Sequence, residues 1–389
     1  MMEMIDLFRK QQWPVTFASA AAQTEHASNL DDLGVHSEAI AVNDSSFDHF
    51  IRTLQPDLVL FDRFTMEEQF GWRVEKHCPD AMRVIETIDL HCLRYARHMQ
   101  CKRQPAVALE VAQSDLYNAI AVREVAAIYR SDLSILVSDY EYELLQSQFS
   151  MPVSQLHRCP FMFDERHISL SPTAYAQRAD FICIGNFRHA PNWDAVLWLR
   201  EKIWPLIRSR LPAASLYIYG AYAPPKAFAL HQPASGFHVL GRADEVDAVM
   251  QQARVCLAPL RFGAGIKTKL ADAMLNGTPC VTTSVGIEGM CRDLDWAGAV
   301  ADHPEAFADA AVSLYQDEMA WRQAQINGFE IVHQLFDSAR NGDGLIRRLL
   351  ALRENLAAHR QQHFTGMMLR HHHQRSTEFM SRWIEAKNR

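Results

Sequence analysis

Short apolar runs alternate with helix-length stretches along the first 165 residues of the chain. The runs that predict buried strands cover residues 13–19, 56–63, 82–89 and 133–139, and two of the intervening helical stretches cover residues 66–77 and 106–130. Apolar runs of this length that alternate with helices are typical of βα units on a parallel sheet, where both faces of each strand are buried. This part of the chain is therefore predicted to be a doubly wound, Rossmann-like α/β domain.

The chain opens on an amphipathic helix. Met1, Met4, Ile5 and Phe8 recur at three- and four-residue spacing, which places them on one helical face. Doubly wound domains normally open on a strand. We therefore expect that the first strand of this domain either lies upstream of Met1 or is missing from the domain.

A second βα series follows a connecting segment at residues 159–178 that holds two prolines and has no sustained period. Its predicted strands cover residues 181–185, 215–220, 237–241, 255–260 and 279–283. We predict an N-terminal domain over residues 1–165, a second Rossmann-like domain over residues 166–343, and a helical tail over residues 344–389. Trp193, Trp198 and Trp204 are expected to pack within the second domain.

The helical tail is basic. Residues 345–389 carry nine Lys or Arg against three Asp or Glu, a local charge of +6, together with five histidines. Such a tail either contacts anionic lipid at a membrane surface or braces the N-terminal domain. The run His371–His373 is expected to be solvated rather than to hold a metal ion.

Length and composition limit the class of protein. The 389 residues suggest two domains, and 39 basic against 46 acidic side chains give a net charge of −7, which makes a chain-wide grip on nucleic acid an unlikely function. The eight cysteines include no C-x-x-C pair, so they are expected to be reduced thiols. There is no apolar run of 18 residues and no signal pattern, so we expect a cytoplasmic protein.

The strongest candidate site follows the apolar run 255–260. Gly263 and Gly265 let the backbone approach a ligand closely, while Arg261 and Lys267 add positive charge at the start of the next helix. This pattern predicts a diphosphate cradle. The alternative is a strand-to-helix turn that uses glycine for its geometry, with the lysines on a solvated face.

Asp272 lies about two turns into the same helix. A carboxylate there would accept hydrogen bonds from a ribose diol. The alternative is an ordinary solvated acid on a helix, which is the more common role of such a residue.

The stretch from Gly185 to Met290 resembles the C-terminal domain of the family 4 retaining glycosyltransferases. The resemblance rests on FICIGNFRHAPNWDAVLWL, on HVLGRADEVDAVMQQARVCLAPL and above all on G-x-G-x-K-x-K-L-x-[DE]-A-M-x-x-G-x-P-x-V-x-T from Gly263 to Thr283. The N-terminal half is similar more loosely, through PDLVLFDRF, ETIDLHCLR and LVSDYEYELL. The resemblance implies a GT-B fold, in which two Rossmann-like domains face a cleft, and transfer of a hexose from a nucleoside-diphosphate sugar.

The resemblance also assigns roles to individual residues. The second acid of the family's Glu-x7-Glu element, which holds the donor ribose, falls on Asp272, whereas the first acid falls on Ala264. Lys267 and Arg261 match the basic residues that neutralise the leaving diphosphate. The positions implied for donor binding are Gly185, Arg188, Gly241, Arg242, Gly263, Ala264, Gly265, Ile266, Thr268 and Asp272.

On the acceptor side, the resemblance points to the segments that follow two strands of the N-terminal domain. His91 is implied as a contact to the donor sugar or acceptor, and Asp62, Arg63, Asp89 and Arg94 lie beside it in sequence or at the neighbouring strand end. A helix-capping Asp89 with a partly buried His91, and an N-cap role for Asp62, are the alternatives. The family's glycine-rich first loop is absent from this sequence.

No D-x-D pair stands at a strand end where a metal-dependent transferase would keep one, so we expect no metal and no other cofactor. The predicted partners are a nucleotide-sugar donor and a glycan or glycolipid acceptor of a surface polysaccharide, with peripheral contact to the inner membrane surface. Two other functions stay open. One is a nucleotide-sugar 2-epimerase, and the other is a catalytically silent GT-B protein that binds a partner.

Overall fold

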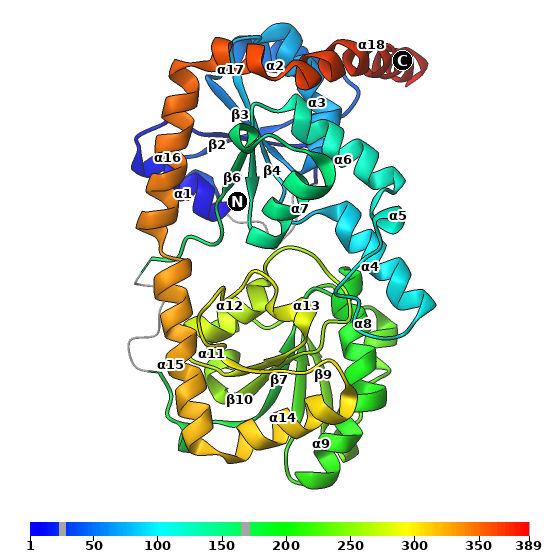
Figure 1. Ribbon diagram of the computed structural model, residues 1–389, viewed down its shortest axis with the longest axis vertical. Coiled ribbons are helices and arrows are strands. Elements are labelled where there is room, and N and C mark those ends of the chain that lie inside the picture. The colour runs from blue at the N-terminus through cyan, green and yellow to red at the C-terminus, as the bar shows by residue number, and fades with distance from the viewer. Residues whose placement is uncertain (23–28, 165–171, 389) are drawn as a thin grey trace.

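The computed structural model describes residues 1–22, 29–164 and 172–388, and the side chains of residues 372–375 and 388 lie outside that description. Two α/β domains lie one above the other, and the helices α15 (Glu318–Leu335) and α16 (Ser338–Glu354) run along one side from the lower domain to the upper one (Figure 1). Among the described residues, no helix combines the length and the apolar character that crossing a bilayer requires. The predicted α/β class with two parallel sheets is confirmed.

The N-terminal domain is built on a four-stranded sheet of order β3-β4-β5-β6, in which all strand pairs are parallel. A separate parallel pair, β1-β2, lies outside this sheet. The strands are β1 (Thr16–Ser19), β2 (His36–Ala39), β3 (Leu58–Asp62), β4 (Met82–Glu86), β5 (Leu133–Leu136) and β6 (Leu156–Arg158). The helices are α1 (Met2–Lys10), α2 (Ser46–Leu54), α3 (Phe64–His77), α4 (His91–Arg103), α5 (Gln113–Leu116), α6 (Ala119–Arg130) and α7 (Asp139–Phe149).

Within this domain, the helix predicted over residues 106–130 is wrong in its first half. Residues 106–112 form no helix, and the backbone N–H of Ala108 donates instead to the carbonyl of Arg261 in the other domain. The helix α6 begins only after Asn118, whose side-chain oxygen accepts the N–H groups of Ile120 and Ala121 as an N-cap. A long-range backbone contact therefore overrides the local preference for helix.

The second domain holds a six-stranded parallel sheet of order β12-β11-β10-β7-β8-β9. Its strands are β7 (Ala179–Ile184), β8 (Leu216–Tyr219), β9 (Phe237–Gly241), β10 (Ala253–Ala258), β11 (Cys280–Thr282) and β12 (Gly298–Val300). Its helices are α8 (Ala190–Trp198), which continues through Leu199–Ile203 into α9 (Trp204–Arg210), then α10 (Pro225–Phe228), α11 (Val246–Gln252), α12 (Thr268–Leu275), α13 (Ser284–Ile287), α14 (Pro304–Gln316) and α15 (Glu318–Leu335). The five strands predicted from the sequence are confirmed, and β12 is the one strand here that the apolar pattern did not indicate.

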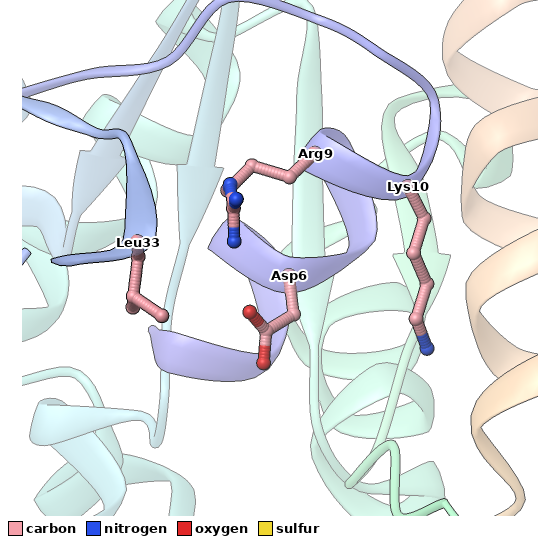
Figure 2. Close-up of a pocket in the computed structure, with 4 residues that line it drawn as sticks. All are labelled: Asp6, Arg9, Lys10 and Leu33. Atoms are coloured by element: carbon pink, nitrogen blue, oxygen red, sulfur yellow. The ribbon is translucent and has the colours of Figure 1, made fainter.

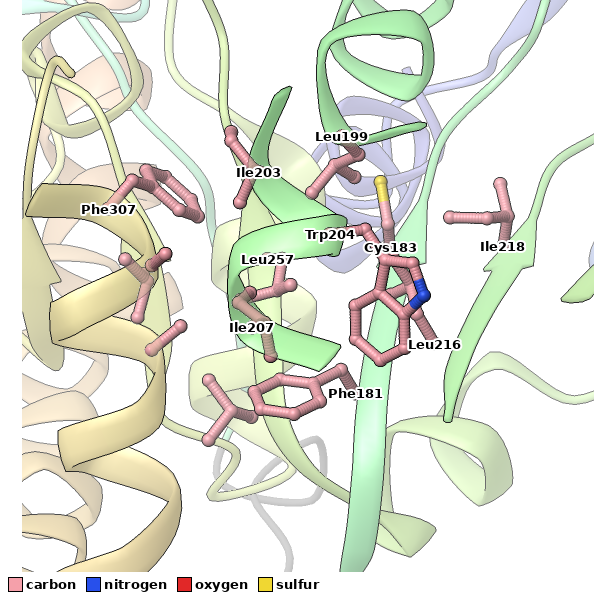
Figure 3. Packing of buried hydrophobic residues seen from close by; sticks show 14 of the residues in the cluster. Phe181, Cys183, Leu199, Ile203, Trp204, Ile207, Leu216, Ile218, Leu257 and Phe307 are labelled. Atoms are coloured by element: carbon pink, nitrogen blue, oxygen red, sulfur yellow. The ribbon is translucent and has the colours of Figure 1, made fainter. Parts of the chain in front are cut away.

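One face of this sheet packs against α8, α9 and α14 through a large apolar cluster (Figure 3). Trp204 is 1% exposed, and its indole N–H donates to the carbonyl of Ser235. Trp198 is buried in the same cluster and Trp193 packs at its edge, as predicted. Close packing against these helices therefore fixes the strands whose ends carry the candidate site.

Replacing Ile218 of β8 by valine tests how well this cluster is packed. Ile218 is fully buried among Phe181, Leu216 and their neighbours, so removal of one methylene leaves a small void. We expect a loss of about 1 kcal/mol in the free energy of unfolding, measured by urea denaturation. A loss below ~0.3 kcal/mol would mean that the cluster relaxes around the void.

The chain then returns to the N-terminal domain through α16 (Ser338–Glu354), α17 (Leu356–Gln362) and α18 (Phe364–Asn388). The apolar face of α16 packs on α1 and on the sheet through Leu345, Ile346 and Leu349. The helices α17 and α18 lie across the top of the domain, and α18 contacts α3 and α6 (Figure 1). The run His371–His373 lies within α18, and the side chains of His372 and His373 lie outside the described part.

Candidate functional site

The first loop of the second domain follows β7 and is tightly packed against a lysine. Lys269, near the start of α12, donates from Nζ to Oδ1 of Asn192 at 2.6 Å. A Cβ added to Gly185 would lie 2.7 Å from the side chain of Asn192 and 2.8 Å from Nζ of Lys269, so a larger residue there would displace these two side chains. The loop and the start of α12 therefore form one basic corner at the carboxyl end of β7.

The glycine-rich loop after β10 reaches across to the N-terminal domain. Gly265 has φ +65°, and a Cβ there would come within 2.7 Å of the carbonyl oxygen of Ile88 and 2.8 Å of Cβ of Asp89. Its N–H donates to Oε1 of Glu141 at 2.8 Å. Ala264, where the resemblance lacks the family's first acid, is buried in the apolar cluster of the N-terminal domain.

Two of the predicted basic residues already have partners in the protein. Nζ of Lys267 donates to the carbonyl of Gly265, and burial lowers the pKa of this lysine. Arg261 forms a two-point ion pair with Asp194, at 2.5 and 2.9 Å. In this conformation Lys269, which the sequence analysis did not single out, is the lysine that lies against the first loop.

Asp272 lies one turn beyond Lys269 on α12. Burial, followed by the nearby charge of Asp247, raises the pKa of Asp272 to about 7, and Lys269 opposes that shift. A carboxyl group whose pKa is strongly raised by burial is a candidate for ligand contact. The exposed Thr268 begins the same helix, whose N-cap position provides no side-chain hydrogen bond.

The ends of β8 and β9 lie next to the first loop. The N–H of Gly185 donates to the carbonyl of Tyr219 at 3.0 Å, and the N–H of Gly220 donates to that of Gly241 at 2.7 Å. Arg188 stacks on Tyr222, with 3.8 Å from its guanidinium carbon to the ring centroid, and Tyr222 is 43% exposed. Exposed Arg242 directly follows Gly241. The predicted positions Gly185, Arg188, Gly241 and Arg242 are thus brought together, and Tyr222 joins them as an open aromatic face.

On the N-terminal domain, the predicted acceptor-side residues gather at the ends of β3 and β4. Arg94 pairs with Asp89, Nε2 of His91 lies 3.4 Å from Oδ1 of Asp89, and Arg63 pairs with Asp62 at 3.0 Å. Buried Glu86 lies in the same group, and its charge and that of Asp89 both act on Arg63. The sequence placed these residues at two strand ends, and the parallel sheet makes them neighbours.

His91 is held by its backbone as well as by its side chain. Its N–H donates to Oε1 of Glu124 at 2.9 Å, and its ring meets Phe64 edge to face, with centroids 5.4 Å apart. Burial, then the charge of Arg94, lowers the pKa of His91 to about 4. The imidazole is therefore neutral at pH 7, and able to donate or accept one hydrogen bond.

The Lys269–Asn192 corner of the second domain and the acceptor-side residues of the N-terminal domain influence the same histidine, His189. The pKa of His189, in the first loop, is lowered by burial and by Arg94, with further effects from Asp89, Lys269 and His91. The backbone of Gly265 in the second domain also lies against Ile88 and Asp89 of the first. We therefore treat Lys269 and His189, together with Asp89, His91 and Arg94, as one candidate site at this contact. His189, Asn192 and Lys269 were missed as site residues, although the segment after β7 and the second lysine of the K-x-K motif were available signals.

A separate surface hollow of about 430 Å³ lies beside α1 and is lined by Asp6, Arg9, Lys10 and Leu33 (Figure 2). No residue predicted for chemistry lines it, and we assign no function to it. Within residues 1–22, 29–164 and 172–388, no group of three His, Cys, Asp or Glu side chains is arranged to hold a metal ion.

Comparison with known proteins bears on the family and the fold. Residues 178–317 match the family described as Glycosyl transferases group 1. An uncharacterized 44.6 kDa protein in the cps region of Klebsiella pneumoniae is 22% identical over 186 residues, which is 46% of this chain and 46% of that relative. The match therefore spans less than half of the relative's length.

Two solved structures are similar in fold. The Anabaena protein HepE in complex with UDP-glucose superposes with a TM-score of 0.67 and 14% identity over 90% of this chain and 95% of HepE. The pneumococcal O-GlcNAc transferase GtfA in complex with UDP and GlcNAc superposes with a TM-score of 0.58 and 18% identity. The superposition covers 79% of this chain and 59% of GtfA. The GT-B fold implied by the resemblance is confirmed, and the second domain is a glycosyltransferase group 1 domain.

Proposed function

We propose that this chain, a glycosyltransferase with a group 1 domain on a GT-B fold, transfers a hexose from a UDP-sugar to a hydroxyl acceptor without a metal ion and with retention of configuration. The observation that carries the proposal is the close approach of Gly265, in the glycine-rich loop, to Ile88 and Asp89 of the N-terminal domain. This contact joins the domain that carries the Lys269–Asn192 corner to the segment that carries Asp89, His91 and Arg94. The complexes of HepE with UDP-glucose and of GtfA with UDP and GlcNAc support UDP as the nucleotide.

Transfer requires that negative charge on the departing diphosphate be stabilised. The bond between the anomeric carbon and the phosphate oxygen breaks, and its electron pair stays with UDP. The acceptor oxygen forms the new bond, and its proton leaves with the diphosphate. We propose that Lys269 and the N–H groups at the start of α12 stabilise this charge, because donors fixed before the reaction need no reorganisation.

The remaining residues divide between the two substrates. We propose that Asp272 accepts hydrogen bonds from the ribose, that Tyr222 and Arg242 line the base, and that His91 and Arg94 contact the sugar or the acceptor. We propose that Gly263 and Ile266 set the shape of the glycine-rich loop. Lys267 and Arg261 hold the loop in place, Lys267 through the carbonyl of Gly265 and Arg261 through its ion pair with Asp194. The cps-region relative supports a surface polysaccharide as the acceptor class.

A membrane surface is the proposed partner of the tail. Along α18, Phe364, Phe379 and Trp383 are 71%, 65% and 59% exposed, and the basic Lys387 stacks on Trp383. Exposed aromatic side chains beside basic residues suit the interface of an anionic bilayer. We therefore propose a cytoplasmic protein that contacts the inner membrane peripherally, while the opposite face of α18 packs on the N-terminal domain.

Calorimetric titration of UDP, GDP, ADP and dTDP without metal tests the proposal. We expect micromolar binding of UDP, binding of the other three at least ~10-fold weaker, and release of UDP when UDP-glucose is incubated with the protein, with water taking the glucose in place of the acceptor. Ten-fold selectivity corresponds to about 1.4 kcal/mol, which a few base contacts supply. Folded protein that binds none of the four nucleotides would contradict the proposal and leave the silent binding protein. Accumulation of epimerised UDP-sugar without an acceptor would favour the epimerase.

A further inference from the structure

One carboxylate oxygen joins the two domains at the site. Oε1 of Glu141, in the first turn of α7, accepts the N–H of Leu90 from the N-terminal domain and the N–H of Gly265 from the glycine-rich loop, both at 2.8 Å. The side chain of Glu141 is completely buried. The side chain of Ser138, the N-cap of α7, accepts the N–H of Glu141 and fixes the start of this helix.

The contact to Leu90 places Glu141 at the start of the helix that carries His91 and Arg94. Leu90 is the N-cap of α4, and the next two N–H groups, of His91 and Cys92, donate to Glu124. Two buried carboxylates therefore satisfy the first backbone donors of α4, which would otherwise have no partner. The position of α4 depends on them.

The contact to Gly265 places the same oxygen at the donor loop. The loop is also held by Arg97, which donates to the carbonyl of Gly263 at 3.0 Å and pairs with Glu288 at 2.7 Å. Because Gly265 has no side chain, its backbone approaches Ile88 closely enough for this short bond. Donor loop and acceptor-side helix are thus tied at one atom.

Burial makes this bridge sensitive to the separation of the domains. A buried carboxyl group that loses a hydrogen bond carries the cost of a polar atom left unsatisfied away from water. Oε2 of Glu141 is buried with no hydrogen-bond partner among the described residues, so Oε1 carries the polar contacts. Withdrawal of the loop would leave Glu141 with Leu90 alone.

We propose that Glu141 is a positioning residue that sets the register of the glycine-rich donor loop against the helix bearing His91 and Arg94. In this proposal Glu141 acts through Gly265 and Leu90 and not on a reacting atom. The inference rests on the proposed donor site for its catalytic consequence. The interdomain contact itself is independent of that function.

Hydrogen exchange and donor turnover in Glu141→Ala and Glu141→Gln test this role. In the protein without nucleotide, we expect Glu141→Ala to speed amide exchange in residues 261–268 and at the start of α4. We expect the kcat of UDP-glucose turnover to fall about 10- to 100-fold while UDP affinity changes less than ~3-fold, since small misplacements at a reacting centre carry effects of that size. Glu141→Gln keeps an acceptor oxygen and should restore most of the protected exchange and of kcat.

Arg292→Ala is the matched control. Arg292 pairs across the domains with Asp139 at 2.7 Å, its side chain is 44% exposed, and it lies off the loop. We expect exchange in residues 261–268 and kcat close to the wild type. Unchanged exchange in Glu141→Ala would overturn the inference, as would equal effects of Glu141→Ala and Arg292→Ala.

The two proposals fail separately. If the wild type binds no UDP, the proposed function fails, while the exchange measurement still decides whether Glu141 holds the loop. If UDP binds and turns over but Glu141→Ala retains the wild-type kcat, this inference fails alone. If Glu141→Ala does not fold, Glu141→Asp takes its place, because its carboxyl group is one methylene too short to reach both Leu90 and Gly265. Faster exchange in residues 261–268 of Glu141→Asp than of Arg292→Ala supports the inference, and equal exchange overturns it.

Discussion

Lys269→Ala is expected to lower the kcat of UDP-glucose turnover about 10²- to 10³-fold, with the fold of the protein unchanged. Nζ of Lys269 is fixed by Asn192 and lies against Gly185, at the corner where we place the diphosphate. Removing one preorganised donor to developing negative charge costs roughly 2.7–4 kcal/mol in other enzymes. Steady-state release of UDP, with the variant's thermal unfolding as a check on folding, measures the effect.

Lys226→Ala is the control for this substitution. Lys226 is an exposed lysine of the same domain, stacked on Trp193, and its removal deletes one exposed positive charge. We expect its kcat within about two-fold of the wild type. Equal activity of Lys269→Ala and Lys226→Ala would remove Lys269 from the donor site. Lys267→Ala would then be the next variant to measure.

Asp132→Ala is expected to destabilise the N-terminal domain by about 3–5 kcal/mol. Its buried carboxylate accepts two hydrogen bonds from Arg360 of α17, at 2.7 and 2.8 Å, and one from the backbone N–H of Arg83 at 2.8 Å. Removing one partner of a buried ion pair leaves the other charge without compensation. Urea denaturation monitored by circular dichroism measures the loss.

An exposed ion pair of the same domain gives the comparison. Asp57 pairs with Arg353 at 2.6 Å, but the side chain of Asp57 is 74% exposed. Water and salt screen this pair, so Asp57→Ala should change the free energy of unfolding by less than ~1 kcal/mol. A similar small change in Asp132→Ala would show that α17 is not held by this carboxylate.

The effect of Asp132 depends on pH in a defined direction. Burial alone would raise the pKa of Asp132, but the hydrogen bonds from Arg360 and the charge of Arg83 outweigh it and lower the pKa. The stability that Asp132 contributes is then full above its unfolded pKa of about 3.9 and is lost as pH falls through the folded pKa. The difference between wild type and Asp132→Ala should therefore be constant from pH 7 to 5 and should shrink below pH 4.

The parallel strands were predictable because each is an apolar run of four to seven residues between helices. The runs at 56–63, 82–89 and 133–139 became β3, β4 and β5, and the motif from Gly263 to Thr283 became a loop, the helix α12 and the strand β11. The strand β2 carries His36, Ser37 and Glu38 on an exposed surface, so its sequence gave no apolar signal. The helix predicted over residues 106–112 was wrong for a different reason, because the backbone of this segment is bound to the other domain through Ala108.

For the site, sequence spacing identified the candidates but not their partners. Asp62, Asp89, His91 and Arg94 were placed at strand ends, and a parallel sheet brings such ends to one edge. That Lys267 binds its own loop while Lys269 reaches Asn192 could not be foreseen, because both lysines stand in the same motif and differ by the rotation of the helix that begins between them.

The sequence by itself determined two things about this protein: the order of its βα units and the group 1 motif, both of which are local patterns of residue type. The tertiary structure alone decided which polar and charged groups meet. Glu141 and Gly265 are 124 residues apart, Arg97 and Glu288 are 191 apart, and Asp132 and Arg360 are 228 apart. Nothing in the spacing of such pairs selects one acid over another. Burial selects these pairs, because a polar or charged group removed from water is stable only beside a partner. The packing of the two sheets and of the returning helices decides which partner that is.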